Sequence, residues 1–139
     1  MLVRMFGVFG VVLGLAYLNE GMAFIGLLPY ALAREAYGVL VTYLLYVTWD
    51  FLFGLSLIVA GMGVLLLKEW ARVMWLGLMP ALVLVHLGII VANELFRNGA
   101  SALYLVWTAM VVGVAALSWW YFTETRIRAR FSPRKEQAT

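Results

Sequence analysis

Four long apolar segments follow one another along the chain, and short stretches that contain polar residues separate them. A helix needs roughly 20 mainly apolar residues to cross a bilayer, because about 30 Å of hydrocarbon is covered at about 1.5 Å per residue. The segments that reach this length are approximately 5–28, a second that ends at Leu67, 73–96 and 102–122. None alternates as barrel strands do, so the pattern predicts an all-α polytopic membrane protein, a four-transmembrane-helix bundle.

The stretch between the first and second segments is left open by the apolar pattern. Pro29 follows the first segment and is typical of a helix end. The second segment begins somewhere between Val39 and Thr48, and the residues before it combine Arg34 and Glu35 with several tyrosines. Such residues suit the headgroup region, either as a short interfacial helix or as a long, tilted extension of the second span. We favour the interfacial helix.

The first segment shares features with a secretory signal, since Arg4 precedes an apolar run and Gly14 and Ala16 resemble a small-residue cleavage site. The apolar run continues past these residues to Leu28. We therefore expect it to be retained as the first span.

Composition agrees with a protein dissolved mainly in lipid. Of the 139 residues, 65% are apolar and 12% are charged, whereas soluble domains are about half apolar and a quarter charged. Cysteine does not occur, which excludes disulfides, thiolate nucleophiles and cysteine-ligated metals. The sequence also contains no HExxH motif, and its single histidine limits any metal site. We expect no catalytic activity, no metal and no cofactor.

Basic residues are distributed unequally between the two sides that an even number of spans defines. One side carries Arg4, Lys68, Arg72, Arg126, Arg128, Arg130, Arg134 and Lys135. The other side carries Arg34 and Arg97. Because basic loops stay in the cytoplasm, we expect both termini to be cytoplasmic.

The basic residues at the end of the chain also predict a lipid contact. We divide the chain into a four-helix transmembrane domain, 1–124, and a basic cytoplasmic tail, 125–139. Basic residues next to a span attract anionic headgroups by about 1 kcal/mol each. The headgroup-contacting residues that we predict are Arg126, Arg128, Arg130, Arg134 and Lys135. They also determine topology, and we expect no nucleic acid partner.

A few polar residues within the spans are candidates for a functional site, because ionisable groups in hydrocarbon are costly. Glu20, Asp50 and His86 come from three helices and lie roughly 20 to 25 Å from the cytoplasmic ends at 1.5 Å per residue. Asn19 adjoins Glu20, and Asn93 follows His86 by seven residues on the same helix face. These five residues form a predicted polar site in the outer half of the membrane, able to bind a proton, a cation or a polar headgroup. In the alternative interpretation, the carboxylates reach interfacial water and His86 bonds a neighbouring carbonyl.

Small residues predict where helices pack closely. Gly10 and Gly14 form a GxxxG pair, and Gly54, Gly61 and Gly113 lie on similar faces of the second and fourth spans. Small residues let helix backbones approach one another in lipid. We expect most of these contacts within the chain, with a homodimer or partner interface as the alternative.

The segment from Gly61 to Arg72, Gly-Met-Gly-Val-Leu-Leu-Leu-Lys-Glu-Trp-Ala-Arg, resembles the cytoplasmic turn of a group of bacterial four-helix integral membrane proteins. Their GxGLL run ends one span and a K/R-x-W-A-R turn begins the next. The resemblance implies a topology and a location in a bacterial cytoplasmic (inner) membrane, and no particular activity. Four spans with an early carboxylate are also similar to small multidrug resistance transporters, which export cations with an embedded glutamate. The residues around Glu20 differ from that family, so this similarity concerns architecture alone.

These observations favour a small accessory or scaffolding subunit of a larger membrane complex. The alternative is a small proton-coupled transporter or ligand-binding membrane protein that uses the polar site. The first interpretation implies association with other membrane subunits or with a second copy.

Overall fold

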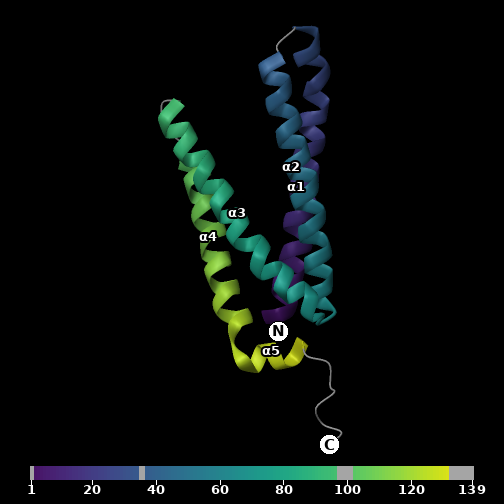
Figure 1. Cartoon of the computed structure of the whole chain (residues 1–139), viewed down its shortest axis with the longest axis vertical. Coiled ribbons are helices and arrows are strands. Elements are labelled where there is room, and N and C mark those ends of the chain that lie inside the picture. The colour runs from purple at the N-terminus through teal and green to yellow at the C-terminus, as the bar shows by residue number, and fades with distance from the viewer. Residues whose placement is uncertain (1, 35–36, 97–101, 132–139) are drawn as a thin grey trace, which may run out of the picture. The chain divides into compact units, whose positions relative to one another are not determined.

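The computed structural model describes residues 2–34, 37–96 and 102–131, without the side chains of 92–96 and 103–104. These residues form helices α1 (Leu2–Ala33), α2 (Tyr37–Leu65), α3 (Glu69–Phe96), α4 (Ala102–Thr123) and α5 (Thr125–Phe131) (Figure 1). In the described part of the chain, four helices are long and apolar enough to cross a membrane. The predicted all-α fold with four spans is confirmed, and the chain is a multi-pass membrane protein.

The first two helices are longer than the sequence pattern predicted. Pro29 lies inside α1, which continues to Ala33, and α2 already begins at Tyr37. The expected end at Pro29 and the expected interfacial helix are therefore wrong, and the alternative of an extended second span is correct. The physical reason is that backbone groups in or near lipid find hydrogen-bond partners most readily inside a helix, even beside a proline.

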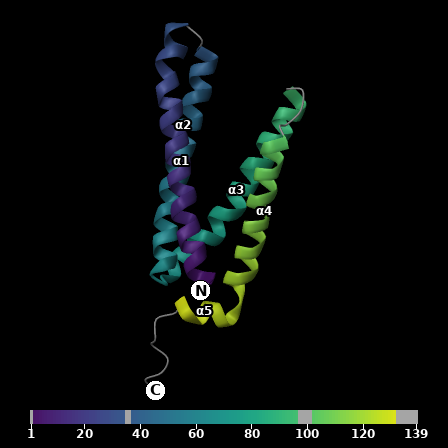
Figure 2. The same cartoon turned by 180° about the vertical axis from the view of Figure 1, so that it is seen from behind.

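The chain divides into two compact units, Met1–Leu66 and Leu67–Thr139. In the first unit, α1 and α2 lie side by side as an antiparallel hairpin (Figures 1 and 2). Buried positions recur every three or four residues on both helices. On α1 they include Val3, Gly7, Gly10, Gly14, Tyr17 and Gly21, and on α2 Asp50, Gly54, Leu57, Gly61 and Val64. A repeat of seven residues keeps one seam of each helix facing its neighbour.

Glycines on this seam bring the two backbones into contact. A Cβ atom at Gly14 would lie 2.5 Å from the carbonyl oxygen of Gly54, and one at Gly61 would lie 2.7 Å from that of Gly7. Real Cβ atoms do not approach backbone atoms so closely, so only glycine fits at these positions. Lipid supplies no hydrophobic force between helices, and close backbone packing of this kind replaces it.

The turn after α2 contains a strained residue. The amide of Leu66 donates to the carbonyl of Met62 over 3.0 Å, and Leu67 adopts a φ of 54°. This left-handed conformation commonly ends helices and costs about 1–2 kcal/mol for a residue with a side chain. The carbonyl of Lys68 then accepts hydrogen bonds from the amides of Ala71 and Arg72 at the start of α3.

In the second unit, the start of α3 is joined to the end of α4 by a buried arginine. Arg72 is 7% exposed, and its guanidinium donates to both carboxylate oxygens of Glu69, over 2.9 and 2.5 Å. Its Nη1 also donates to the carbonyl oxygen of Phe122 over 2.9 Å. The ring of Trp75 packs against Phe122 at a centroid distance of 6.3 Å. These contacts satisfy a backbone carbonyl in the last turn of α4 that would otherwise lack an intrahelical partner.

Helix α5 follows α4 after one residue and packs back onto it. The carbonyl of Glu124 accepts hydrogen bonds from the amides of Ile127 and Arg128. Ile127 and Phe131 are buried, and the Phe131 ring lies 5.8 Å from that of Phe122. The apolar residues at positions i and i+4 thus hold one face of α5 against the unit.

Replacing Gly14 with alanine should destabilise the protein by about 1–3 kcal/mol, because the new methyl group would overlap the Gly54 backbone. Gly26 provides a matched control on the same helix, since a Cβ there meets nothing within 4 Å. Gly26→Ala should leave stability unchanged or raise it slightly through helix propensity. Unfolding followed by circular dichroism in detergent measures both. Equal stability of the two variants would contradict the backbone contact.

Replacing Arg72 with methionine should destabilise the protein by about 1.5–3 kcal/mol, since charge-assisted hydrogen bonds to Glu69 and Phe122 would be lost. The exposed neighbour Lys68 serves as the control, and Lys68→Met should change stability by less than about 0.5 kcal/mol. The same detergent unfolding measurement applies. A wild-type midpoint for Arg72→Met would show that the arginine does not join the two helices.

Candidate intramembrane polar site

The Asp50 side chain occupies a seam position of α2 and therefore lies between two helices. Its exposure is 4%, and its Oδ2 atom has no hydrogen-bond partner within the described part of the protein. Opposite it is Gly21 of α1, where a Cβ atom would lie 3.1 Å from the Cβ of Asp50. The same Cβ would lie 2.9 Å from the Phe51 ring, so the glycine leaves room for both α2 side chains. An aspartate at this position is thus built into the helix contact.

Glu20 lies beside this position on α1, but its side chain is exposed, as is that of Asn19. The Glu20 and Asp50 carboxylates are close enough to interact electrostatically as like charges. The structure therefore brings together two of the predicted site residues from two helices. One is enclosed in the hairpin, and the other is at its surface.

Both carboxylates lie near the middle of their helices. Glu20 is 16 residues from Arg4 and 14 from Arg34, or about 24 and 21 Å at 1.5 Å per residue. The distance between these arginines, about 45 Å, matches the full thickness of a bilayer with its headgroups. Asp50 is 13 residues from the start of α2 and 15 from its end. Both carboxylates are thus far from the ends of their helices, and their predicted position in the outer half of the membrane stays a prediction.

His86 belongs to the second unit and is 6% exposed. Its Nδ1 atom lies 2.9 Å from the carbonyl oxygen of Leu82, one turn earlier in α3. A carbonyl can only accept, so this bond requires the proton on Nδ1. It is the contact anticipated in the alternative interpretation of this histidine. Convergence of His86 with the two carboxylates stays a prediction, and the Asn93 side chain lies outside the described residues.

The predicted packing glycines differ in their surroundings. Gly14, Gly54 and Gly61 lie at the backbone contact, and Gly10 is buried beside it, with its carbonyl carbon 3.2 Å from a Cβ at Gly61. At Gly113, a Cβ would meet no atom of the described residues within 4 Å, so its predicted role in helix packing stays a prediction.

Gly7 also belongs to the backbone contact between α1 and α2, although it is not part of the GxxxG pair. The signal that could have found it is the seven-residue spacing of Gly7, Gly14 and Gly21, which matches the spacing of Gly54 and Gly61.

The predicted headgroup residues on α5 have the exposure that lipid contact requires. Arg126, Arg128 and Arg130 are exposed, on a helix whose apolar residues Ile127 and Phe131 are buried. Arg134 and Lys135 lie outside the described residues. The short helix thus orders three of the five basic side chains.

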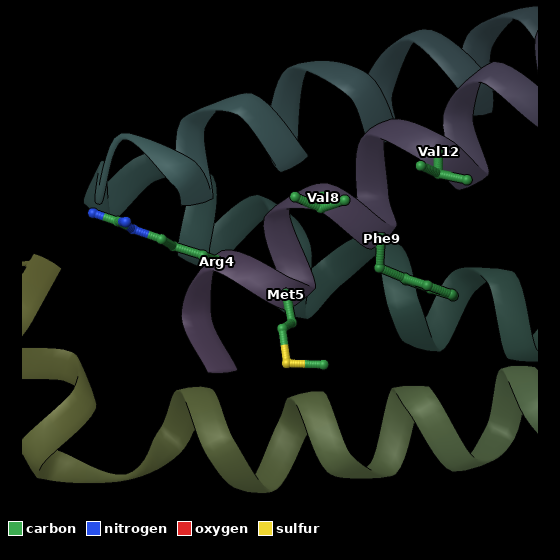
Figure 3. A pocket seen from close by; sticks show the side chains of 5 residues that line it. All are labelled: Arg4, Met5, Val8, Phe9 and Val12. Carbon is green, nitrogen blue, oxygen red and sulfur yellow. The ribbon is translucent and has the colours of Figure 1, made fainter. Parts of the chain in front are cut away.

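The described residues were also compared with what a metal site or a catalytic site requires. No group of three or more histidine, aspartate or glutamate side chains lies together there as a metal site would require. Along the first turns of α1, Arg4, Met5, Val8, Phe9 and Val12 line a hollow (Figure 3). Four of these five side chains are apolar, so the hollow lacks an acid–base pair for catalysis.

Comparison of the chain with protein-family models, curated proteins and solved structures found no match.

Proposed function

We propose that the protein is a small accessory subunit of a membrane complex, and that the α1 surface around Asn19 and Glu20 contacts another subunit. The observation that carries this proposal is the exposed Glu20 carboxylate near the middle of a spanning helix. The partner is a membrane helix that presents a basic side chain or hydrogen-bond donors to Glu20 and Asn19.

The cost of leaving Glu20 in lipid supports this proposal. A charged side chain at the centre of a spanning helix costs roughly 2.5–3.5 kcal/mol on insertion scales, and such residues usually face protein or a water-filled cavity. Glu20 is too far from either helix end for its short side chain to reach the headgroups. Contact with a complementary subunit would replace the lost hydration. The neighbouring Asn19 amide would add a donor and an acceptor.

The proposed location is a bacterial cytoplasmic membrane, with both termini in the cytoplasm. The unequal distribution of basic residues supports this orientation. The exposed arginines of α5 would then lie against the anionic lipids of the inner leaflet.

A photo-reactive residue at position 19 should cross-link to a different membrane protein when intact native membranes are irradiated. Val59 on α2 is the control position, because its side chain is also exposed but lies away from the two polar residues in sequence. Adducts at Val59 should contain lipid. Mass spectrometry of the adducts identifies both products. Adducts from position 19 only with lipid, with a second copy or within the same chain would contradict an accessory role through this surface.

Charge reversal provides a second readout on the same complex. Glu20→Lys should reduce co-purification with the partner by about tenfold or more, because truncating a buried charge pair costs about 2 kcal/mol or more. The conservative Asn19→Gln should retain the partner. Unchanged recovery with Glu20→Lys would remove this carboxylate from the interface.

The proposed lipid contact predicts that replacing Arg126, Arg128 and Arg130 with glutamine will reduce the anionic lipid that co-purifies with the protein. Each basic residue contributes about 1 kcal/mol near an anionic surface, so the loss should be large. Arg34→Gln, after the last residue of α1, is the control and should retain the lipid. Native mass spectrometry counts the bound lipids. Equal lipid retention by the two variants would contradict the contact.

A further inference from the structure

The first hairpin encloses a carboxyl group whose hydrogen-bonding capacity is incompletely used. Asp50 is more than nine-tenths buried, and its Oδ2 has no partner in the described part of the protein. An ionised carboxylate accepts several hydrogen bonds and is costly to bury without them. A neutral carboxylic acid has a much smaller burial cost. The geometry therefore favours the protonated form.

The groups that face Asp50 strengthen this preference. Glu20 on α1 interacts with it as a like charge, and no described salt bridge involves Asp50. The other titratable group that α1 brings to this level is the buried Tyr17, whose ring lies 6.1 Å from Phe53. On α2 itself, Tyr46 is exposed one turn earlier. A tyrosine side chain cannot carry a positive charge, so neither of these residues balances a negative charge on Asp50.

We propose that the α1–α2 hairpin is a proton-binding site, in which Asp50 holds one proton at neutral pH. Two close carboxylates resist double ionisation and burial disfavours the charged form, so the enclosed Asp50 keeps its proton. The site rests on contacts within the first unit alone. It is independent of whether Glu20 also contacts another subunit.

Proton binding at Asp50 also links hairpin stability to pH. The folded hairpin holds a proton that an exposed aspartate in the unfolded chain would release at neutral pH. The folded state therefore binds more protons, and its stability falls as the pH rises. Asp50→Asn, which cannot ionise, should remove this part of the pH dependence.

A hydrophobic carbodiimide tests the protonation state directly in the full-length protein. The carboxyl O–H adds across a C=N bond of dicyclohexylcarbodiimide, and the O-acylisourea rearranges to a stable N-acylurea without a leaving group. The reaction consumes the carboxyl proton, so an ionised carboxylate does not react. Peptide mass spectrometry should find the adduct at Asp50 at neutral pH, declining as the pH is raised. Asp50→Asn should show no adduct at this position.

Glu20→Gln separates proton binding from a purely structural role. Removal of the like charge makes Asp50 easier to ionise, so the pH at which labelling falls to half should decrease. Met22→Leu, at an exposed apolar position on the same helix, is the control and should leave this midpoint unchanged. A residue that served only for packing would show no such shift.

Infrared spectroscopy provides a second readout that needs no reagent access. A protonated Asp50 should give a carboxylic acid C=O band at neutral pH that is absent from Asp50→Asn. Absence of this band from the wild-type protein would overturn the proposal. Protection of Asp50 from the carbodiimide by sodium ions at constant pH would also overturn it, since it would identify a cation site in place of a proton site.

Discussion

The contact between two helix backbones at Gly14 and Gly54 determines the arrangement of the first unit. Close approach there fixes which residues of α1 and α2 face one another, because the same register also joins Gly7 to Gly61. Continuing that seam leads to Gly21 and Asp50. The position of the buried carboxyl group is therefore a consequence of how the glycines pack. In lipid, the burial of apolar surface contributes little to helix association. The close fit of the two backbones therefore determines how α1 pairs with α2.

A polar residue within an apolar seam has a recognised structural effect. In coiled coils, one buried polar side chain can specify register at some expense in stability. Asp50 is placed in the same way, opposite a glycine that gives it space. A structural role in register and a chemical role in proton binding are compatible, because both require the carboxyl group to be held in the helix contact.

The sequence predicted the features that depend on length and hydropathy, and missed those that depend on which face of a helix meets another. Four spans follow from four apolar segments, because lipid leaves the backbone few alternatives. The helix ends were harder to predict, since Pro29, which is typical of a helix end, lies inside α1. Gly14 and Gly113 look equivalent in small-xxx-small patterns, yet among the described residues only the first lies at a backbone contact. For the site, residue types predicted Glu20 and Asp50 together, whereas their different exposure required the structure.

Each compact unit is built from helices that are consecutive in the chain, with three residues between α1 and α2. Its stabilising contacts therefore join segments that are synthesised within a short interval of one another. Chains with local contacts fold quickly, and N-terminal parts fold first during synthesis. The glycine-packed hairpin can thus close within the membrane as soon as α2 has been inserted, while α3 is still emerging from the ribosome. Biogenesis would then proceed by pairs of helices, with the buried carboxyl group enclosed in the first step.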